Sequence, residues 1–337
     1  MEAVDVRGRF VWHELMTRDV PGARKFYAGL AGWRIEPWST DPNYSICSNA
    51  TGPQAGLFAI PDDMPADMPA HWVSYIGTRD VDGTAGAAVR AGASILKEPT
   101  DIVGAGRYAV LKDPQGAAFA ILDPENARPE VDGAAALGAF AWHELATSDS
   151  EAALAFYGGL FGWDALERMD MGPAGIYLIF GSHGVRRGGM YIKQPDNPMP
   201  PNWLPYVAHA DSDQAHAFLA TAGGTSMLPP MSVPGGGRIA IFLDPTGAAF
   251  ATHSMPAAAS SAKAKPKAKA KPKAKGKALP KAKPKAKAAP AKKKLAARKP
   301  APKKQVLKKA AAKNAVRKPP KKKSPARHKS KSVRRKK

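Results

Sequence analysis

Two segments of this 337-residue chain carry the same run of Trp, His and Glu. The first is Trp12-His13-Glu14, and the second, 130 residues later, is Trp142-His143-Glu144. A carboxylate beside flat aromatic rings can orient a planar or cationic organic ligand, and a partly buried carboxylate can take a proton from an acidic C–H group. We therefore predict Glu14 and Glu144 as ligand-facing or catalytic residues, with a structural ion pair as the alternative.

Other aromatic and basic residues recur at nearly the same spacing and complete the candidate site. The predicted ligand-binding residues are Trp12, Trp33, Tyr75 and Arg107, matched by Trp142, Trp163, Tyr206 and Arg238. The tryptophans at 33 and 163 follow helix-ending glycines, so a place in the core is an alternative for them. The tyrosines could simply fill space, and the arginines could pair with Glu14 and Glu144.

These residues belong to two copies of one unit. Phe10 to Leu15 returns as Phe140 to Leu145 at an offset of 130, and Asp113 to Phe119 returns as Asp244 to Phe250 at an offset of 131. So many matches at nearly fixed spacing indicate a duplication. The predicted domains are residues 9–124 and 139–256, joined by a linker over 125–138 and followed by a separate tail over 257–337.

Each copy predicts the element order β-α-β-β-β twice over, which is an α+β fold. Residues 9–17 alternate as a strand, and Asp19 can cap a helix that ends near Gly32. A second helix should run from an Asp80 cap to about Gly92. The remaining strands are expected near 33–38, 43–48, 55–60, 72–77, 94–96, 107–112 and 117–122.

The chain over residues 9–256 resembles the vicinal oxygen chelate superfamily, which includes glyoxalases, bleomycin-resistance proteins and extradiol dioxygenases. The resemblance rests on the His-Glu-Leu start, the Asp-capped helix ending in Phe-Tyr and Gly-Trp, and the closing Asp-Pro-x-Gly hairpin, all present twice. It implies paired βαβββ modules whose mixed sheet curls into a cup with the ligand site inside. Lyases, dioxygenases, epimerases, thiol transferases and non-catalytic drug binders share this fold, so the resemblance leaves the activity open.

The resemblance also implies a divalent metal in the cup, but its usual ligand positions are lost here. They fall on Trp12, Gly56, Val73 and Ala120 in the first copy and on Trp142, Gly189, Leu204 and Ala251 in the second. None of these side chains binds a hard cation, so we predict no metal and no other cofactor. His13 and His143 remain as weak candidates, since neighbouring strand residues face opposite sides and neither histidine should share the cup with its glutamate.

The tail is a polycation attached to an acidic body. Residues 257–337 contain 34 Lys or Arg and no Asp or Glu, whereas residues 1–256 contain 17 basic and 28 acidic residues, a net charge of −11. We expect the tail to be disordered and to bind nucleic acid without sequence specificity, because each Lys near a phosphate displaces a counterion. Representative predicted contacts are Lys263, Lys265, Lys267, Lys292, Lys293, Lys294, Lys321, Lys322, Lys323, Arg334 and Arg335.

The remaining features suggest a cytoplasmic, nucleoid-associated protein without a membrane partner. The first residues lack the character of a signal peptide, no apolar run is long enough to span a bilayer, and Cys47 is the single cysteine. The two copies could form a monomeric pseudo-dimer, or the chain could form a homodimer. Three functions compete: a metal-free binding protein for a small ligand, held on nucleic acid by its tail; a lyase, isomerase or dioxygenase of the same superfamily; and a histone-like nucleoid protein with a scaffold body.

Overall fold

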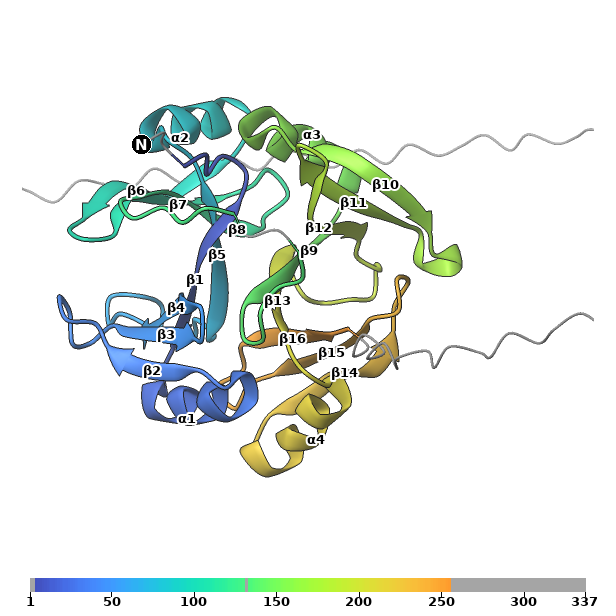
Figure 1. Ribbon diagram of the computed structural model, residues 1–337. Coiled ribbons are helices and arrows are strands. Elements are labelled where there is room, and N and C mark those ends of the chain that lie inside the picture. Colours follow the sequence, from blue (N-terminus) through green and yellow to red (C-terminus); the bar gives the residue numbers. More distant parts are fainter. Residues whose placement is uncertain (1–3, 131–132, 256–337) are drawn as a thin grey trace, which may run out of the picture. The chain divides into compact units, whose positions relative to one another are not determined.

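The computed structural model describes residues 4–130 and 133–255, so the predicted tail contacts, from Lys263 to Arg335, lie outside the described residues. The first copy has the predicted element order (Figure 1). Its elements are β1 (Phe10–Thr17), α1 (Val20–Ala31), β2 (Arg34–Pro37), β3 (Ser45–Asn49), β4 (Gly52–Ala59), β5 (His71–Gly77), α2 (Val81–Arg90), β6 (Ser94–Ile102), β7 (Gly106–Lys112) and β8 (Ala118–Pro124).

The second copy repeats the order and adds one short 3-10 helix, η1 (Gly172–Ala174). Its other elements are β9 (Phe140–Thr147), α3 (Ser150–Phe161), β10 (Asp164–Asp170), β11 (Ile176–Ser182), β12 (Val185–Ile192), β13 (Asn202–Ala208), α4 (Ser212–Ala222), β14 (Thr225–Ser232), β15 (Arg238–Leu243) and β16 (Ala249–Ser254).

Each copy forms one eight-stranded mixed sheet. The first sheet has the order β2-β3-β4-β1-β5-β8-β7-β6, and the second has the matching order β10-β11-β12-β9-β13-β16-β15-β14. β1 runs parallel to β4 and antiparallel to β5, so the first strand of each copy lies at the centre of its sheet. This arrangement confirms the predicted α+β fold of two tandem domains built from paired βαβββ modules.

Sequence signals at the helix ends explain why the helices start and stop where they do. The Asp19 carboxylate accepts a hydrogen bond from the backbone N–H of Gly22 at 2.9 Å, and the Asp80 carboxylate accepts one from Gly83 at 2.8 Å. α1 ends at Gly32, whose φ of 67° lies in the left-handed region that glycine adopts without strain.

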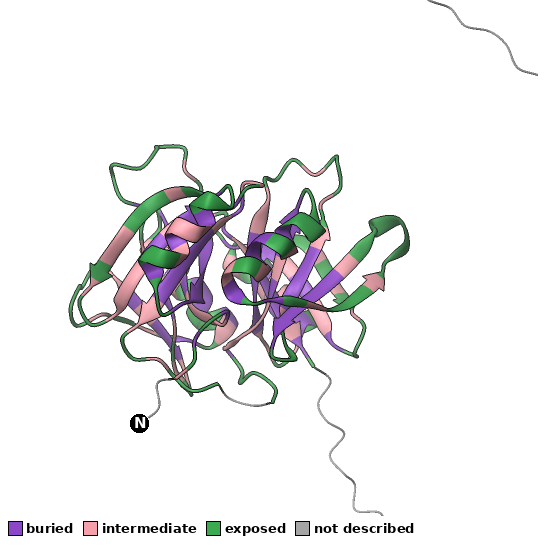
Figure 2. Ribbon diagram, turned by 90° about the horizontal axis from the view of Figure 1, so that it is seen from above, coloured by how far each residue is buried: buried purple, intermediate pink, exposed green. Residues whose placement is uncertain are grey.

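The helices of the two copies pack as pairs, α1 beside α4 and α2 beside α3 (Figure 1). Each pair contributes to a core made by both copies. Phe26 and Tyr27 of α1 share one core cluster with Leu219 of α4, and Phe156 and Tyr157 of α3 share another with residues of α2 and β8. Buried residues follow the strands and the inner helix faces, while loops and outer helix faces are exposed (Figure 2).

Candidate functional site

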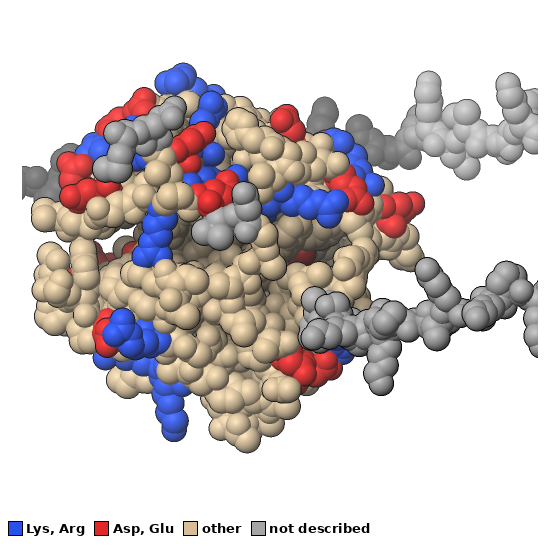
Figure 3. All heavy atoms as spheres, in the orientation of Figure 1, with Lys and Arg blue, Asp and Glu red and all other residues tan. Residues whose placement is uncertain are grey.

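Burial along β1 separates two sets of side chains. His13 and Leu15 are buried, whereas Trp12 and Glu14 are half-buried, as expected when successive strand residues face opposite sides of a sheet. Trp12 packs with Val73, Tyr75 and other residues of the central strands in a small apolar cluster separate from the helix-covered cores. We call this half-buried face of the first sheet cup 1, and the matching face around Trp142, Leu204 and Tyr206 cup 2. Figure 3 shows the surface hollowed at its left edge, between the α1 side and the α2 side of the first sheet.

A chain of hydrogen bonds ends on the Glu14 carboxylate in cup 1. Tyr44 donates from its hydroxyl to Glu14 Oε1 at 2.7 Å, and Tyr75 donates to Glu14 Oε2. The Trp12 indole N–H donates to the Tyr44 hydroxyl at 2.9 Å. Glu14, Trp12 and Tyr75 are therefore brought together as the sequence suggested, and Tyr44 joins them.

Cup 2 contains the same arrangement. Tyr177 and Tyr206 donate to the two oxygens of Glu144 at 2.6 and 2.7 Å, and Trp142 donates to the Tyr177 hydroxyl at 2.9 Å. The repetition of four residues with the same hydrogen bonds shows that the two sheets hold one kind of site.

Burial and hydrogen bonding have opposite effects on the pKa of these two carboxylates. Burial raises the pKa of Glu14, and the hydrogen bonds from Tyr75, Tyr44 and Trp12 act in the opposite direction. Glu144 behaves in the same way, with its pKa raised by burial and lowered in part by Tyr177 and Tyr206. Burial and the nearby Glu14 charge also hold the pKa of Tyr44 well above its ordinary value, so this phenol stays protonated as a donor.

Further aromatic rings extend the wall of each cup. Tyr44 stacks on Phe58 with ring centroids 5.5 Å apart, and Tyr75 lies 6.3 Å from Tyr108. In cup 2, Tyr177 stacks on Tyr191 at 6.4 Å.

Sequence reasoning missed this second group of aromatic residues, although one signal could have found them. Tyr44 and Tyr177, like Phe58 and Tyr191, are 133 residues apart, as are Gly56 and Gly189. Extending that offset through the third strand would have aligned the tyrosines.

The residues at the family's metal positions do not fit a divalent cation. In cup 1, Glu14 is paired in the sheet with Gly56 and Val73, and Tyr75 is paired with Ala120. A Cβ atom added at Gly56 would overlap the Tyr44 hydroxyl, so the tyrosine occupies the space of a side chain at that position. In the part of the chain that the structure describes, no three His, Cys, Asp or Glu residues lie close enough together to hold a metal ion.

His13 and His143, the weak metal candidates, meet each other between the two sheets. Their Nε2 atoms are 2.7 Å apart, and both residues are about 95% buried. His13 stacks on Phe140 and His143 stacks on Phe10, each with ring centroids 3.5 Å apart. His13 lies on the side of β1 opposite Glu14, as strand alternation requires, and there it contacts the other copy because the central strands β1 and β9 approach each other. Burial lowers the pKa of His143 to about 3 and lowers the pKa of His13 strongly.

Trp33 and Trp163 lie away from the cups. They are 3% and 2% exposed and belong to the two cores beneath the helix pairs. The Trp33 indole donates to the carbonyl oxygen of Gly138 at 2.7 Å, and the Trp163 indole donates to that of Gly8 at 2.8 Å. Each tryptophan therefore ties its own copy to the residues just before the first strand of the other copy, which matches the core alternative rather than ligand binding.

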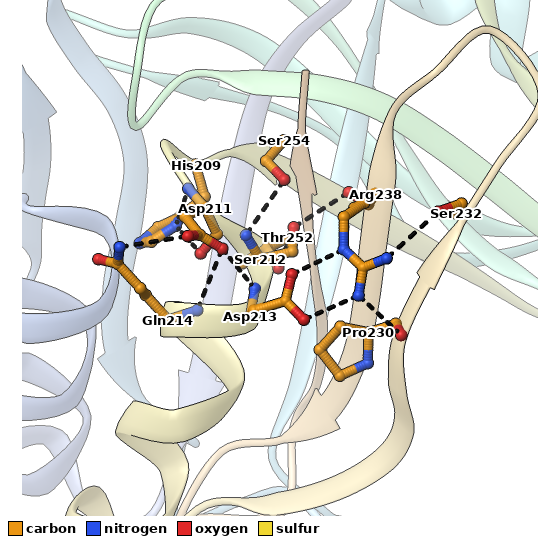
Figure 4. Close-up of polar contacts among 10 residues, drawn as sticks. All are labelled: His209, Asp211, Ser212, Asp213, Gln214, Pro230, Ser232, Arg238, Thr252 and Ser254. Atoms are coloured by element: carbon orange, nitrogen blue, oxygen red, sulfur yellow. Dashed lines mark hydrogen bonds and ion pairs between the residues drawn. The ribbon is translucent and has the colours of Figure 1, made fainter. Parts of the chain in front are cut away.

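Arg107 and Arg238 are also separate from Glu14 and Glu144. Arg107 binds Asp82 in the first turn of α2 at 2.6 Å and Asp101 at 3.0 Å. Arg238 binds Asp213 in the first turn of α4 at 2.6 Å, and its guanidinium also reaches Ser232 and the Pro230 carbonyl (Figure 4).

Strand alternation explains this placement of the arginines. Tyr108 and Ile239, the residues that follow them, pack with the cup clusters, so the arginines point to the other side.

No helix in the described ranges has the length and apolar character needed to cross a membrane.

The described fold is similar to solved structures of low sequence identity. A Mn(II)-bound glyoxalase from Novosphingobium aromaticivorans superposes with a TM-score of 0.53 and 14% identity over 74% of this chain and 82% of that one. The 2,3-dioxygenase LapB from Pseudomonas sp. KL28 gives a TM-score of 0.52 and 11% identity over 75% and 93% of the two chains.

The chain also has relatives of higher sequence identity, and the alignments span most of the length of each relative. CFP32 of Mycobacterium bovis, provisionally named a glyoxylase, is 31% identical over 242 residues, which is 71% of this chain and 92% of CFP32. The anthracycline biosynthesis protein DauV of Streptomyces sp. strain C5 is 31% identical over 277 residues, which is 76% of this chain and 98% of DauV.

Two family models match the body, one in each copy. The model of the glyoxalase-like domain matches residues 12–122, and the model of the Glyoxalase/Bleomycin resistance protein/Dioxygenase superfamily matches residues 139–252. Together with the duplicated sheets and the full-length relatives, these matches show that the chain belongs to the glyoxalase/bleomycin resistance protein/dioxygenase superfamily.

Proposed function

We propose that the body is a binding protein that holds a small planar or cationic organic molecule against the aromatic walls of its cups, without a metal. The observation that carries the proposal is the duplicated hydrogen-bonded group of Trp12, Tyr44, Glu14 and Tyr75, which has rings and one carboxylate where a metal-dependent relative needs several metal ligands. Aromatic surface with a few fixed polar groups is the usual composition of a small-molecule site.

The names of two relatives support a planar ligand. DauV and the similar DnrV of Streptomyces peucetius are anthracycline biosynthesis proteins, and anthracyclines contain fused, planar rings. Such a molecule could stack on the Tyr44 and Phe58 rings of cup 1 or on the Tyr177 and Tyr191 rings of cup 2.

Native mass spectrometry of the purified protein, before contact with any chelator, tests this part of the proposal. We expect a mass without metal that carries an organic adduct, and the adduct would identify the ligand class. A stoichiometric metal ion would contradict the metal-free site and favour an enzyme.

An enzymatic function is the second candidate, because burial raises the pKa of Glu14 and Glu144 toward the range of a general base. In this case either carboxylate would take a proton from an acidic C–H group of the substrate. Turnover of a candidate substrate that is lost in the double variant Glu14→Gln, Glu144→Gln would favour this function over simple binding.

The tail suggests where the protein acts. With 34 Lys or Arg and no acidic residue, residues 257–337 are proposed to hold the body on nucleic acid without sequence specificity, in the cytoplasm and at the nucleoid. The full chain should bind duplex DNA with an affinity that falls steeply as salt increases, and residues 1–256, with their net charge of −11, should not bind. Comparable binding by the truncated protein would contradict the tether.

A further inference from the structure

The two cup carboxylates have no positively charged partner in the described part of the body. Glu14 and Glu144 accept hydrogen bonds from neutral tyrosine hydroxyls, whereas the ion pairs among the described residues involve other acidic groups. Hydrogen bonds satisfy the carboxylate oxygens, but neutral donors leave the net charge in place. A half-buried charge without a counter-charge is costly, and a bound cation would relieve that cost.

The hydrogen-bond directions in cup 1 make Glu14 an acceptor. An indole N–H can only donate, so the Tyr44 oxygen accepts from Trp12, and the Tyr44 hydroxyl hydrogen points to Glu14 Oε1. Trp142, Tyr177 and Glu144 repeat this one-way chain in cup 2. An oxygen that receives such a donor is prepared to carry negative charge.

The surrounding rings favour the same kind of ligand. Tyr44, Phe58, Tyr75 and Tyr108 form two close ring pairs beside Glu14. The face of an aromatic ring attracts a cation, and rings around a carboxylate combine this attraction with direct charge pairing. A neutral planar molecule would gain the stacking and leave the carboxylate without a counter-charge.

We propose that each cup selects an organic cation whose positive nitrogen lies against the carboxylate of Glu14 or Glu144 among the aromatic rings. This inference rests on the proposed binding function and narrows its ligand to alkylammonium or N-alkylated aromatic compounds. The chain itself contains the same chemistry, because the lysines of residues 257–337 are alkylammonium groups. A free small molecule and a lysine of the same chain are therefore two sources of one kind of ligand.

The test compares two probes of similar shape on the full chain by isothermal titration calorimetry at pH 7.5. N-Methylquinolinium is cationic and 4-methylquinoline is neutral. In the variant Glu14→Gln, Glu144→Gln, the amide oxygen can still accept from Tyr44 or Tyr177, so the charge is removed with little change in shape. We expect this variant to bind N-methylquinolinium about ten-fold more weakly and 4-methylquinoline unchanged.

Two controls locate the effect. Glu151→Gln removes a carboxylate on the outer surface of α3 and should leave both affinities unchanged. In ¹⁵N spectra, the indole signals of Trp12 and Trp142 should shift on binding, while those of the core residues Trp33 and Trp163 should stay in place and report an intact fold.

The outcomes separate the two proposals. Equal binding of both probes, unaffected by the double variant, would overturn the cation preference and leave the binding function standing. Failure of both probes to bind would overturn both. Adding heparin alone distinguishes the sources. Movement of the Trp12 and Trp142 signals would show that lysines of the same chain occupy the cups, and unmoved signals would assign the cups to free organic cations.

Discussion

The Tyr44 hydroxyl has two hydrogen-bond partners in cup 1, so its removal should affect the stability of the protein. It accepts from Trp12 and donates to Glu14, so its loss leaves one donor and one acceptor without their partner. We expect Tyr44→Phe to lower the free energy of unfolding by about 1–2 kcal/mol and to raise the pKa of Glu14 further. Urea denaturation measures the first effect.

Tyr177→Phe is the matched variant in cup 2 and should cost a similar amount, since Tyr177 has the same two partners. Tyr108→Phe is the control, because the Tyr108 hydroxyl has no hydrogen-bond partner among the described residues. An equal loss in Tyr44→Phe and Tyr108→Phe would show that the hydroxyl network contributes nothing to stability.

The buried histidines predict a dependence of stability on pH. His13 and His143 have pKa values lowered by burial, to about 3 for His143, so the folded protein keeps them neutral below pH 6.5, where the unfolded chain takes up protons. Their contribution to stability is complete above about pH 6.5 and declines as the pH falls toward 3. Each histidine can contribute a slope of about 1.4 kcal/mol per pH unit in that range.

The variant His13→Gln, His143→Gln isolates this contribution. Glu14 and Glu144 act in the opposite direction, because a raised pKa stabilises the fold as the pH falls, and they are present in both proteins. Urea denaturation from pH 7.5 to 4.5 should therefore give a shallower pH slope for the double variant. Identical slopes would mean that the histidines titrate normally in the folded protein.

Single residues were predictable where their strand had a fixed register. Trp12, Glu14 and Tyr75 meet because β1 and β5 are directly paired, and the register is continuous from Trp12 to Met16 although it shifts between Phe10 and Trp12. The sequence pattern predicts Arg107 in cup 1, but its neighbour Tyr108 faces the cup instead. An error of one residue in the register of a strand moves every side chain to the opposite face. Tyr44 is the last residue of the irregular segment between β2 and β3, and such a segment gives no register from sequence alone.

At the scale of elements, the Asp-Pro-x-Gly hairpins fasten each copy to a helix of the other. Asp113 Oδ1 accepts three backbone N–H groups within its own turn, while Oδ2 accepts the Tyr157 hydroxyl of α3 at 2.9 Å. The Trp203 indole in turn donates to Tyr157. Asp244, Tyr27 and Trp72 form the reciprocal set. Two motifs that look independent in the sequence, Phe-Tyr and Asp-Pro-x-Gly, are thus partners.

Tyr157→Phe should test this fastening. The change leaves Asp113 Oδ2 and the Trp203 indole without a partner in a buried place, so we expect a loss of about 2–3 kcal/mol in the free energy of unfolding. Tyr27→Phe should cost about as much because its partners are equivalent. Denaturation of both variants beside Tyr108→Phe measures the difference, and a loss below that of the control would exclude a structural role for these bonds.

The helices and turns were predictable because particular residue types mark where they begin and end. Asp19 and Gly32 bound α1 as capping residues do, and Pro114 with Gly116 marks the turn between β7 and β8. β6 runs from Ser94 to Ile102, well beyond the expected residues 94–96. Its pairing with β7 breaks register twice and it is largely exposed, so it lacks the alternating pattern that identifies a strand.

At the scale of the whole body, each of the two helix-covered cores is built by both copies. One cluster joins Leu30 of α1 with Leu219 of α4 and Phe250 of β16, and the other joins Val81 of α2 with Phe156 and Phe161 of α3. The duplication was visible in the sequence, but the exchange of helix contacts was not, because a repeat pattern does not say which copy covers which helix.

Separated halves should therefore fail to fold as monomers. We expect residues 1–130 alone to lack near-ultraviolet circular dichroism or to form a dimer, and mixing with residues 131–255 should restore the signal of the joined body. Light scattering after size-exclusion chromatography distinguishes these states. A monomeric half that unfolds cooperatively would contradict the shared cores.

The contact between His13 and His143 carries one more consequence. Two identical nitrogens at 2.7 Å need one proton between them, so one imidazole donates and the other accepts. The two copies, alike in sheet order and in their cups, therefore differ in tautomer at their meeting point. A single hydrogen atom thus breaks the twofold relation of the body. Exchanging the roles of the two halves would need two proton movements, one between the Nε2 atoms and one at the Nδ1 atoms in the opposite sense, because the first alone would leave an imidazolate beside an imidazolium.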